Sequence, residues 1–127
     1  MRGGHLMIGI GIDAVNVQRF GAVIERTPRL IDRLFTDKER ELAARRADSS
    51  AMLAARFAVR EATMKALGVG LGAFDFHDVS VQSNPDGGPS LLVDGRAAEL
   101  ARSRGVTQWH ISLTHTDHLA VAVVAAC

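Results

Sequence analysis

The chain has 127 residues, of which 47% are hydrophobic and 23% are charged, a size and composition typical of one compact domain with its own core. Its formal net charge of +1 excludes a general nucleic-acid binder, since such a protein needs a concentrated positive field to displace counterions from phosphates. The single cysteine, Cys127, excludes an intramolecular disulfide and a thiolate metal cage within one chain.

The apolar segments at the two ends of the chain are short. The N-terminal residues contain no apolar run of signal-peptide length. The run at 119–127 is far shorter than the about 20 residues that a membrane-spanning helix needs. We therefore expect a cytoplasmic protein that is not embedded in a membrane. We interpret residues 1–6 as a leader or disordered segment and residues 7–127 as the folded domain.

The first predicted element is a strand followed by an acidic residue. Residues 7–12 alternate isoleucine and glycine, which predicts a short buried strand whose glycines allow close backbone approach. Asp13 ends this pattern. Its carboxylate either caps the helix predicted over residues 14–26 or holds a cation, and the residues alone leave both open.

A short helix is predicted in the middle of the first half. The Thr-Pro pair at 27–28 ends the preceding helix and starts a new turn. Thr36 and Glu39 have the spacing of a capping box, in which each residue satisfies a backbone N–H of the other. This pattern predicts a helix over residues 37–46.

The longest predicted helix begins at Ser49 or Ser50, either of which can act as its cap, and ends at Gly68. It carries Glu61 and Lys65 one turn apart at the border of its apolar face. Spacing alone favours an ordinary surface ion pair. If the first strand packs beside this helix, Asp13 and Glu61 become two hard oxygen ligands suited to Mg²⁺. Lys65 would then face a phosphate.

The second half of the sequence is richer in strand patterns. Residues 79–82 alternate apolar and polar side chains, and the NPDGGP turn leads into SLLVDG, which together predict a β-hairpin. A short helix is expected over 96–103, ending at Gly105. The last 19 residues are expected to form two strands around a turn near Asp117. This order predicts an α+β fold with helices mostly early and strands mostly late.

Three histidines, His110, His115 and His118, lie in the last predicted hairpin. A zinc site is one interpretation, but in a strand the first two would point to opposite faces, and no cysteine assists. A second interpretation is a polar edge strand without a ligand. A third is that these imidazoles and the neighbouring hydroxyls bind a phosphate or a nucleotide.

Four segments in a fixed order, GIDAVNVQRF, FTDKE, RFAVREATMKALG and WHISLTHT, resemble one protein family. From about residue 7 to its end, the chain is similar to the holo-acyl-carrier-protein synthases, which are short phosphopantetheinyl transferases. The resemblance implies a single α+β domain with a long helix packed on a small antiparallel sheet. It also implies a homotrimer with active sites at the subunit interfaces.

The activity that this resemblance implies is Mg²⁺-dependent. The enzyme would transfer 4′-phosphopantetheine from coenzyme A to a serine of an apo acyl carrier protein and release adenosine 3′,5′-bisphosphate. Asp13 and Glu61 match the family's magnesium site, and Lys65 matches the lysine near the transferred phosphate. These three residues form the predicted catalytic set. Glu61, directly or through a bound water, is also the candidate acceptor of the serine proton.

The resemblance also implies binding residues. The predicted contacts to coenzyme A are Arg56, Lys65, Ser112 and His115. The predicted contacts to the carrier protein are Arg19, Arg26 and Arg29. Their alternative interpretation is a solvated basic face.

One position departs from the family pattern. The family usually has lysine immediately before the helix glutamate, whereas this chain has Arg60. Arginine keeps the charge but not the compact ammonium, so any role that needs a neutral amine is in doubt, while a phosphate contact stays open.

Two other functions stay open on the sequence alone. One is a non-catalytic module that binds coenzyme A or a carrier protein, and the other is a magnesium-dependent enzyme acting on another pyrophosphate substrate. The carrier would belong to fatty acid biosynthesis, polyketide synthesis or peptide synthesis, and the sequence does not select one of them.

Overall fold

The computed structural model describes residues 6–127. Apart from Leu6, the leader expected over residues 1–6 therefore lies outside the described residues. A short 3-10 helix, η1 (Phe76–Asp78), precedes the hairpin. The other elements are β1 (Gly9–Asn16), α1 (Val17–Arg26), α2 (Leu30–Leu34), α3 (Asp37–Ala44), α4 (Ser49–Leu67), β2 (Val79–Ser83), β3 (Pro89–Val93), α5 (Gly95–Ser103), β4 (Trp109–His115) and β5 (Leu119–Ala126).

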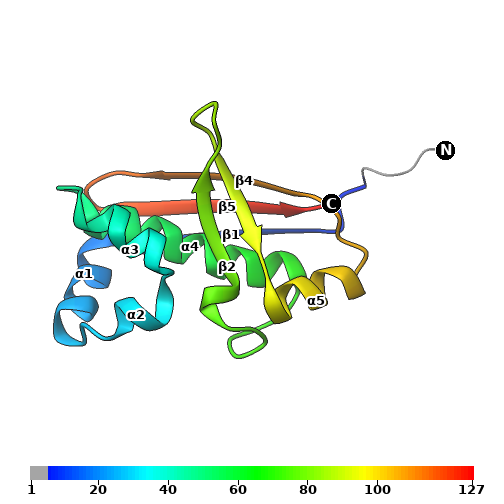
Figure 1. The fold of residues 1–127 in the computed structure, drawn as a ribbon, viewed down its shortest axis with the longest axis horizontal. Coiled ribbons are helices and arrows are strands. Elements are labelled where there is room, and N and C mark those ends of the chain that lie inside the picture. Colours follow the sequence, from blue (N-terminus) through cyan, green and yellow to red (C-terminus); the bar gives the residue numbers. More distant parts are fainter. Residues whose placement is uncertain (1–5) are drawn as a thin grey trace.

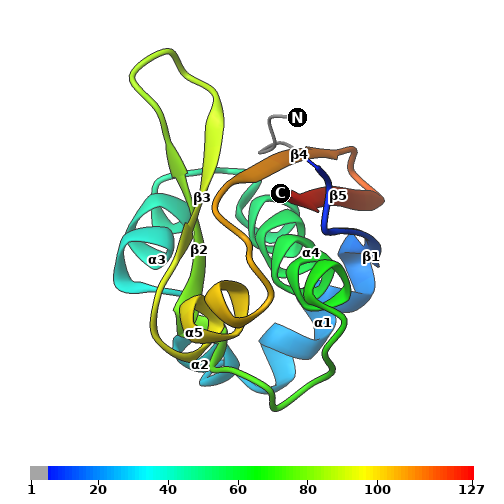
Figure 2. The ribbon, with the colours of Figure 1, turned by 90° about the vertical axis from the view of Figure 1, so that its right-hand side faces the viewer.

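The strands form two antiparallel sheets, one with the order β1-β5-β4 and one made of the β2-β3 hairpin. The long helix α4 runs beneath the three-stranded sheet, with α1, α2 and α3 grouped at one end and α5 at the other (Figure 1). The tip of the hairpin projects away from the rest of the chain (Figure 2). The predicted α+β fold, with a long helix on a small antiparallel sheet, is confirmed. Within residues 6–127, no helix has both the length and the apolar composition needed to cross a membrane.

The glycines of β1 allow this strand to lie directly on α4. A Cβ atom added to Gly9 would lie 1.9 Å from the carbonyl oxygen of Ala66, and one added to Gly11 would lie 1.9 Å from the carbonyl oxygen of Ala62. Neither distance leaves room for a side chain, so the predicted close backbone approach is confirmed. Small residues on both elements bring the strand and helix backbones together.

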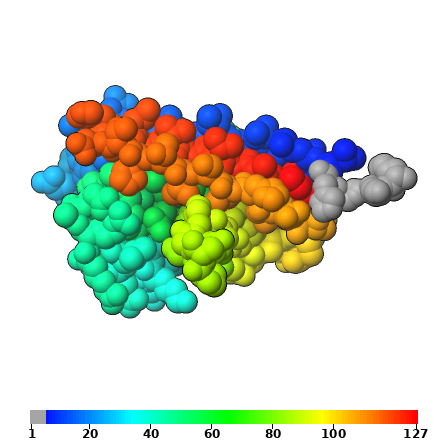
Figure 3. Space-filling view, turned by 90° about the horizontal axis from the view of Figure 1, so that it is seen from above, coloured from blue at the N-terminus to red at the C-terminus, as the bar shows by residue number. Residues whose placement is uncertain are grey.

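The isoleucines of β1 face the other way. Ile10 and Ile12 are each 59% exposed in the single chain, because alternation along the strand turns the glycines toward α4 and the isoleucines outward. The expectation of a buried strand is therefore wrong for this face. Viewed from above, β1, β5 and β4 lie side by side with no other element over them (Figure 3).

The helix boundaries follow most of the predicted signals. The capping box is present, with the Thr36 side chain accepting from the Glu39 backbone and the Glu39 side chain accepting from the Thr36 backbone. Gly68 adopts a left-handed φ of 70° after α4, as expected. The cap predicted at Ser49 or Ser50 is wrong, because the N-cap of α4 is Asp48, whose side chain makes no capping hydrogen bond.

We predict that Gly11→Ala destabilises the protein by at least about 2–3 kcal/mol, because the new methyl group meets the backbone of α4. Gly21→Ala in α1 is the matched control. Its new Cβ would lie 3.4 Å from the Ser50 hydroxyl oxygen, and the change should stabilise the helix by about 1 kcal/mol. Urea unfolding measures both effects. Equal stabilities for the two variants would contradict the close packing of β1 on α4.

Candidate active site

The first cluster of candidate residues lies where β1 passes α4. The Lys65 ammonium donates to the backbone carbonyl of Ile12 at 2.9 Å and lies 3.3 Å from a carboxylate oxygen of Asp13. Asp13 therefore pairs across elements and does not cap α1, whose N-cap is Asn16. The interpretation of Asp13 as a helix cap is wrong. Its position next to the long helix, on which the cation interpretation depends, is confirmed.

Glu61 stands beside this pair with no neutralising partner of its own. Among residues 6–127 its side chain makes no hydrogen bond or ion pair, so the simple Glu61–Lys65 surface bridge does not form. Partial burial raises the pKa of Glu61, and the negative charge of Asp13 raises this pKa further, while Lys65 lowers it. The carboxylates of Asp13 and Glu61 and the ammonium of Lys65 thus lie close together where β1 meets α4.

A pocket of about 600 Å³ opens beside these carboxylates. Its polar lining consists of Asp13, Asn16, Arg19 and Glu61, and side chains from α1, α2 and α4 supply much of an apolar wall. The wall includes the aromatic rings of Phe20 and Phe57, whose centroids lie 5.6 Å apart. The pocket therefore joins a small acidic centre to a surface that suits an apolar or mixed ligand.

The carboxylate pair suits Mg²⁺ by its chemistry. No group of three or more His, Cys, Asp or Glu side chains gathers as a metal site within residues 6–127. Magnesium needs only one or two protein carboxylates, since water and substrate phosphates fill its other positions. A divalent cation would also stabilise the charged form of Glu61 against the burial and the Asp13 charge that raise its pKa.

The second cluster lies on a different side of α4. Arg56 and His115 line a pocket of about 240 Å³ together with Arg46. The His115 ring nitrogen Nε2 lies 3.7 Å from a carboxylate oxygen of Asp48. Arg56 and Glu61 are five positions apart, which rotates them by about 140° around a helix. Within one chain the structure therefore does not bring Arg56 and His115 to the acidic centre.

Ser112 lies apart from both clusters. It is exposed, and it shares a row of the outer sheet face with Val123 and Ile12. His115 is three positions further along β4 and lies on the opposite face, next to the pocket of Arg56. His110 shares the outer face with Ser112. The expected placement of His110 and His115 on opposite faces is confirmed.

The three candidate arginines for a carrier protein are exposed. Arg19 and Arg26 are on α1, and Arg29 immediately precedes α2. Of the three, Arg19 lines the pocket of Asp13 and Glu61. A partner that touches Arg19 would thus reach the acidic centre.

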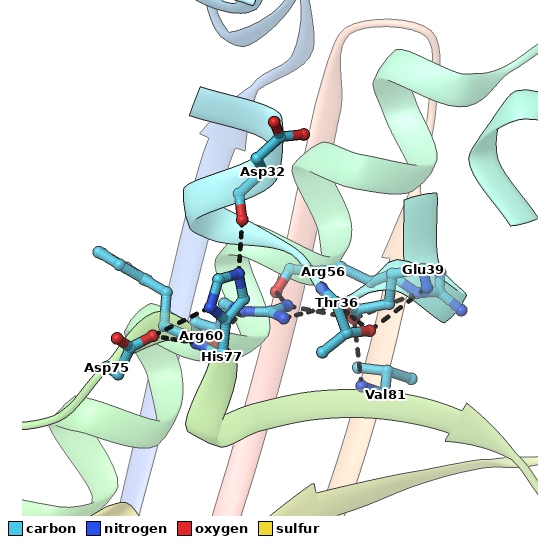
Figure 4. Close-up of polar contacts among 9 residues, drawn as sticks. Asp32, Thr36, Glu39, Arg56, Arg60, Asp75, His77 and Val81 are labelled. Carbon is cyan, nitrogen blue, oxygen red and sulfur yellow. Dashed lines mark hydrogen bonds and ion pairs between the residues drawn. The ribbon is translucent and has the colours of Figure 1, made fainter. Parts of the chain in front are cut away.

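Sequence reasoning missed the role of Glu39 beyond the capping box. This side chain is only 3% exposed and lies between α3, α4 and β2. Its carboxylate accepts from Arg60 at 2.5 and 3.2 Å, and it also accepts from the backbone N–H of Val81 at 3.3 Å (Figure 4). The spacing of the capping box gives no sign of these contacts, because they join segments distant in sequence.

Arg60, the departure from the family pattern, is fully buried at 0% exposure. Besides its bonds to Glu39, its Nε atom donates to the carbonyl of Phe76 at 2.9 Å. Its guanidinium lies 5.1 Å from the centre of the Phe35 ring, at a distance where cation–π attraction acts. A buried side chain with these partners is not available to a substrate phosphate, so the phosphate contact left open for Arg60 is not supported.

Comparisons with known proteins agree with this architecture. Residues 9–124 match the 4′-phosphopantetheinyl transferase superfamily. The chain is 45% identical to a holo-acyl-carrier-protein synthase of Salinispora arenicola, over 95% of this chain and 98% of that protein. It is 46% identical to one of Streptomyces griseus, over 95% of this chain and 98% of that protein. The crystal structure of the Helicobacter pylori synthase in complex with coenzyme A has 28% identity and a TM-score of 0.78, covering 93% of this chain and 99% of that chain.

The fold is therefore that of a phosphopantetheinyl transferase. The chain belongs to the 4′-phosphopantetheinyl transferase superfamily, and the relatives that match it over nearly their full length are holo-acyl-carrier-protein synthases.

We predict that Glu61→Gln stabilises the metal-free protein at neutral pH. The raised pKa of Glu61 means that its charge is less favourable in the folded state than in the unfolded state. The gain should be under about 1 kcal/mol, because solvent screens a partly exposed group. It should vanish as the pH falls below the ordinary pKa of a glutamate, where both states are protonated.

Thermal unfolding at several pH values measures this difference. Glu99→Gln, at an exposed position of α5, is the control and should change stability little at any pH. A Glu61→Gln variant that is less stable than the wild type at neutral pH would show that Glu61 has a favourable partner, contrary to the structure.

Proposed function

We propose that this chain is a holo-acyl-carrier-protein synthase, which transfers 4′-phosphopantetheine from coenzyme A to a serine of an apo acyl carrier protein. Its family membership and its similarity to such synthases along nearly the whole chain support this function. The observation that carries the proposal is the cluster of Asp13, Glu61 and Lys65 between β1 and α4. Two carboxylates and one ammonium are the groups that a metal-assisted phosphoryl transfer requires.

Asp13 and Glu61 would hold the magnesium ion. The support is that both carboxylates line one pocket, and that burial and then the charge of Asp13 raise the pKa of Glu61. When bound, the ion would supply positive charge to the pyrophosphate of coenzyme A and offset the charge that develops there.

The transfer makes one bond and breaks one. The serine hydroxyl oxygen attacks the β-phosphorus of coenzyme A, and the bond from that phosphorus to the bridging pyrophosphate oxygen breaks, so adenosine 3′,5′-bisphosphate leaves. Lys65, whose side chain is 56% exposed, can turn its ammonium from Asp13 to a phosphate oxygen and neutralise the leaving group. Glu61 is the candidate acceptor of the serine proton, since a raised pKa makes a carboxylate a better base.

We propose that the protein is a homotrimer whose active sites lie between subunits. Two observations support this. The outer sheet face exposes Ile10 and Ile12 in the single chain, and burying such a face stabilises an assembly. In addition, Arg56 and His115 lie on a different side of α4 from Asp13 and Glu61. In a trimer, these arginine and histidine side chains would contact coenzyme A that reacts at a neighbour's acidic centre.

The carrier protein would approach the exposed arginines Arg19, Arg26 and Arg29. Such a basic face speeds encounter with an acidic carrier helix and orients it. Arg19 then brings the carrier serine to the pocket of Asp13 and Glu61. A cytoplasmic location remains a prediction, and the carrier can belong to fatty acid biosynthesis, polyketide synthesis or peptide synthesis.

We predict that the protein, incubated with coenzyme A, Mg²⁺ and an apo acyl carrier protein, adds phosphopantetheine to the carrier serine, as read by mass spectrometry. Asp13→Asn and Glu61→Gln should each lower the rate by at least about 100-fold, since both remove charge at the metal. Both should also weaken Mn²⁺ binding in the absence of substrate, measured by electron paramagnetic resonance. Full activity of both variants would contradict the metal assignment.

The same assay separates the alternative functions. Tight coenzyme A binding without modification of any of several carrier proteins would indicate a binding module. Release of adenosine 3′,5′-bisphosphate without modification of a carrier would indicate an enzyme with another substrate. Either result would contradict the proposed function.

The trimer is tested by light scattering. We predict a mass of three chains for the wild type and a smaller mass for Ile12→Lys, because a charge in the centre of an apolar interface is costly. Leu92→Lys replaces a residue of β3 that is 42% exposed and belongs to the separate two-stranded sheet, so it should leave the mass unchanged. A monomeric wild type would contradict the proposed assembly.

A further inference from the structure

One carboxylate faces two buried arginines in this structure. Arg60 is 0% exposed, Arg56 is 9% exposed, and Glu39 is 3% exposed. Within residues 6–127, Glu39 is the acidic side chain that lies within ion-pair distance of either arginine. The cluster therefore has two positive charges for one negative charge. Such an imbalance is costly in a buried environment unless another anion joins it.

Each carboxylate oxygen of Glu39 accepts from Arg60 and from a backbone N–H. The Arg60 guanidinium donates to one carboxylate oxygen at 2.5 Å and to the other at 3.2 Å. The Thr36 backbone N–H donates to the first oxygen at 3.0 Å, and the Val81 N–H donates to the second at 3.3 Å. This is the two-point geometry in which a guanidinium binds a carboxylate most strongly.

Arg56 is left without a hydrogen-bonding partner. Its Nε atom lies 3.7 Å from Glu39, and within the described part of the chain this buried atom has no hydrogen bond. Burial lowers the pKa of Arg56, and the attraction of Glu39 offsets only part of that effect. The same side chain lines two neighbouring pockets, one bordered by Lys38, Arg45, Glu39 and Glu41 and the other by Arg46 and His115. No acidic side chain of residues 6–127 lines the second pocket, so an anion there would complete the charge balance.

We propose that Arg60 is a positioning residue: by occupying both oxygens of Glu39, it keeps Arg56 free to bind a phosphate group of coenzyme A. This inference rests on the proposed function, because it takes coenzyme A as the ligand of Arg56. The two arginines thus have different tasks although they are one helical turn apart. Arg60 neutralises Glu39, and Arg56 neutralises the substrate.

In this chain, the planar guanidinium of Arg60 makes this division between the two arginines. A lysine at the same position would present one compact ammonium and could not span both carboxylate oxygens with fixed geometry. The second oxygen would then be available to Arg56, which needs to move by less than about 1 Å to reach hydrogen-bond distance. Arg56 would then form an ion pair with Glu39 and would bind phosphate less tightly.

The test compares Arg60→Lys with the wild type in the transfer reaction. We expect the KM for coenzyme A to rise about tenfold, the effect of losing one charge-assisted hydrogen bond, with kcat nearly unchanged. Arg102→Lys makes the same substitution at an exposed position of α5 and should leave both constants unchanged. An unchanged KM in Arg60→Lys, or a fall in kcat alone, would overturn the proposal.

The double variant Arg60→Lys/Glu39→Gln separates positioning from a structural role. Removing the carboxylate charge releases Arg56 again, so the KM should return toward the wild-type value even though the protein loses a buried ion pair. A structural role predicts the opposite, because two destabilising changes would then impair the enzyme further. Since KM does not depend on the folded fraction, partial unfolding of the double variant does not obscure the comparison.

Dephospho-coenzyme A identifies which phosphate Arg56 contacts. If the KM penalty of Arg60→Lys disappears with this analogue, the contact is to the 3′-phosphate, and if it persists, the contact is to the pyrophosphate. Calorimetric titration of coenzyme A into wild type and Arg60→Lys separates this proposal from the proposed function. A wild type that transfers nothing contradicts the function, whereas equal affinities in the two proteins contradict the positioning role.

Discussion

The active site depends on the direct contact between β1 and α4. Gly9 and Gly11 leave no space for a side chain between the strand and the backbone of the helix. This contact sets the strand so close that Asp13 meets Lys65 and faces Glu61, although 52 residues separate the ion-paired aspartate and lysine in the chain. Any larger residue in place of either glycine would separate the carboxylates that are proposed to hold magnesium.

The buried Glu39 cluster serves a complementary purpose on the other side of α4. It ties the start of α3 and strand β2 to the middle of α4 through one carboxylate. A single helix thus carries two sets of charges: Glu61 and Lys65 toward β1, and Arg56 and Arg60 toward α3 and the hairpin. In the proposed trimer these two sets act on different coenzyme A molecules, so the packing between subunits fixes where Arg56 lies relative to the acidic centre that acts on the same substrate.

Much of this arrangement could be predicted from the sequence because the signals are local. The glycine alternation and the capping box at Thr36 each identified an element from a few neighbouring residues. The spacing of Glu61 and Lys65 alone favoured a surface ion pair that does not form, because Lys65 pairs with Asp13 instead. The contacts of Arg60 could not be predicted in this way, because its partner Glu39 is 21 residues distant in the chain. The capping box at Thr36 already explained why a glutamate stands at position 39. The outward isoleucines were also misjudged, because an apolar strand does not reveal whether its second face meets its own chain or another copy.

The most direct measurement is a crystal structure of the protein with coenzyme A and Mg²⁺. The account predicts magnesium on the carboxylates of Asp13 and Glu61, a phosphate on the guanidinium of Arg56, and an Arg60–Glu39 pair unchanged from the one described above. It also predicts that one subunit supplies the acidic centre and its neighbour supplies Arg56. Magnesium bound away from Asp13 and Glu61, or a phosphate held by Arg60 after it leaves Glu39, would contradict it.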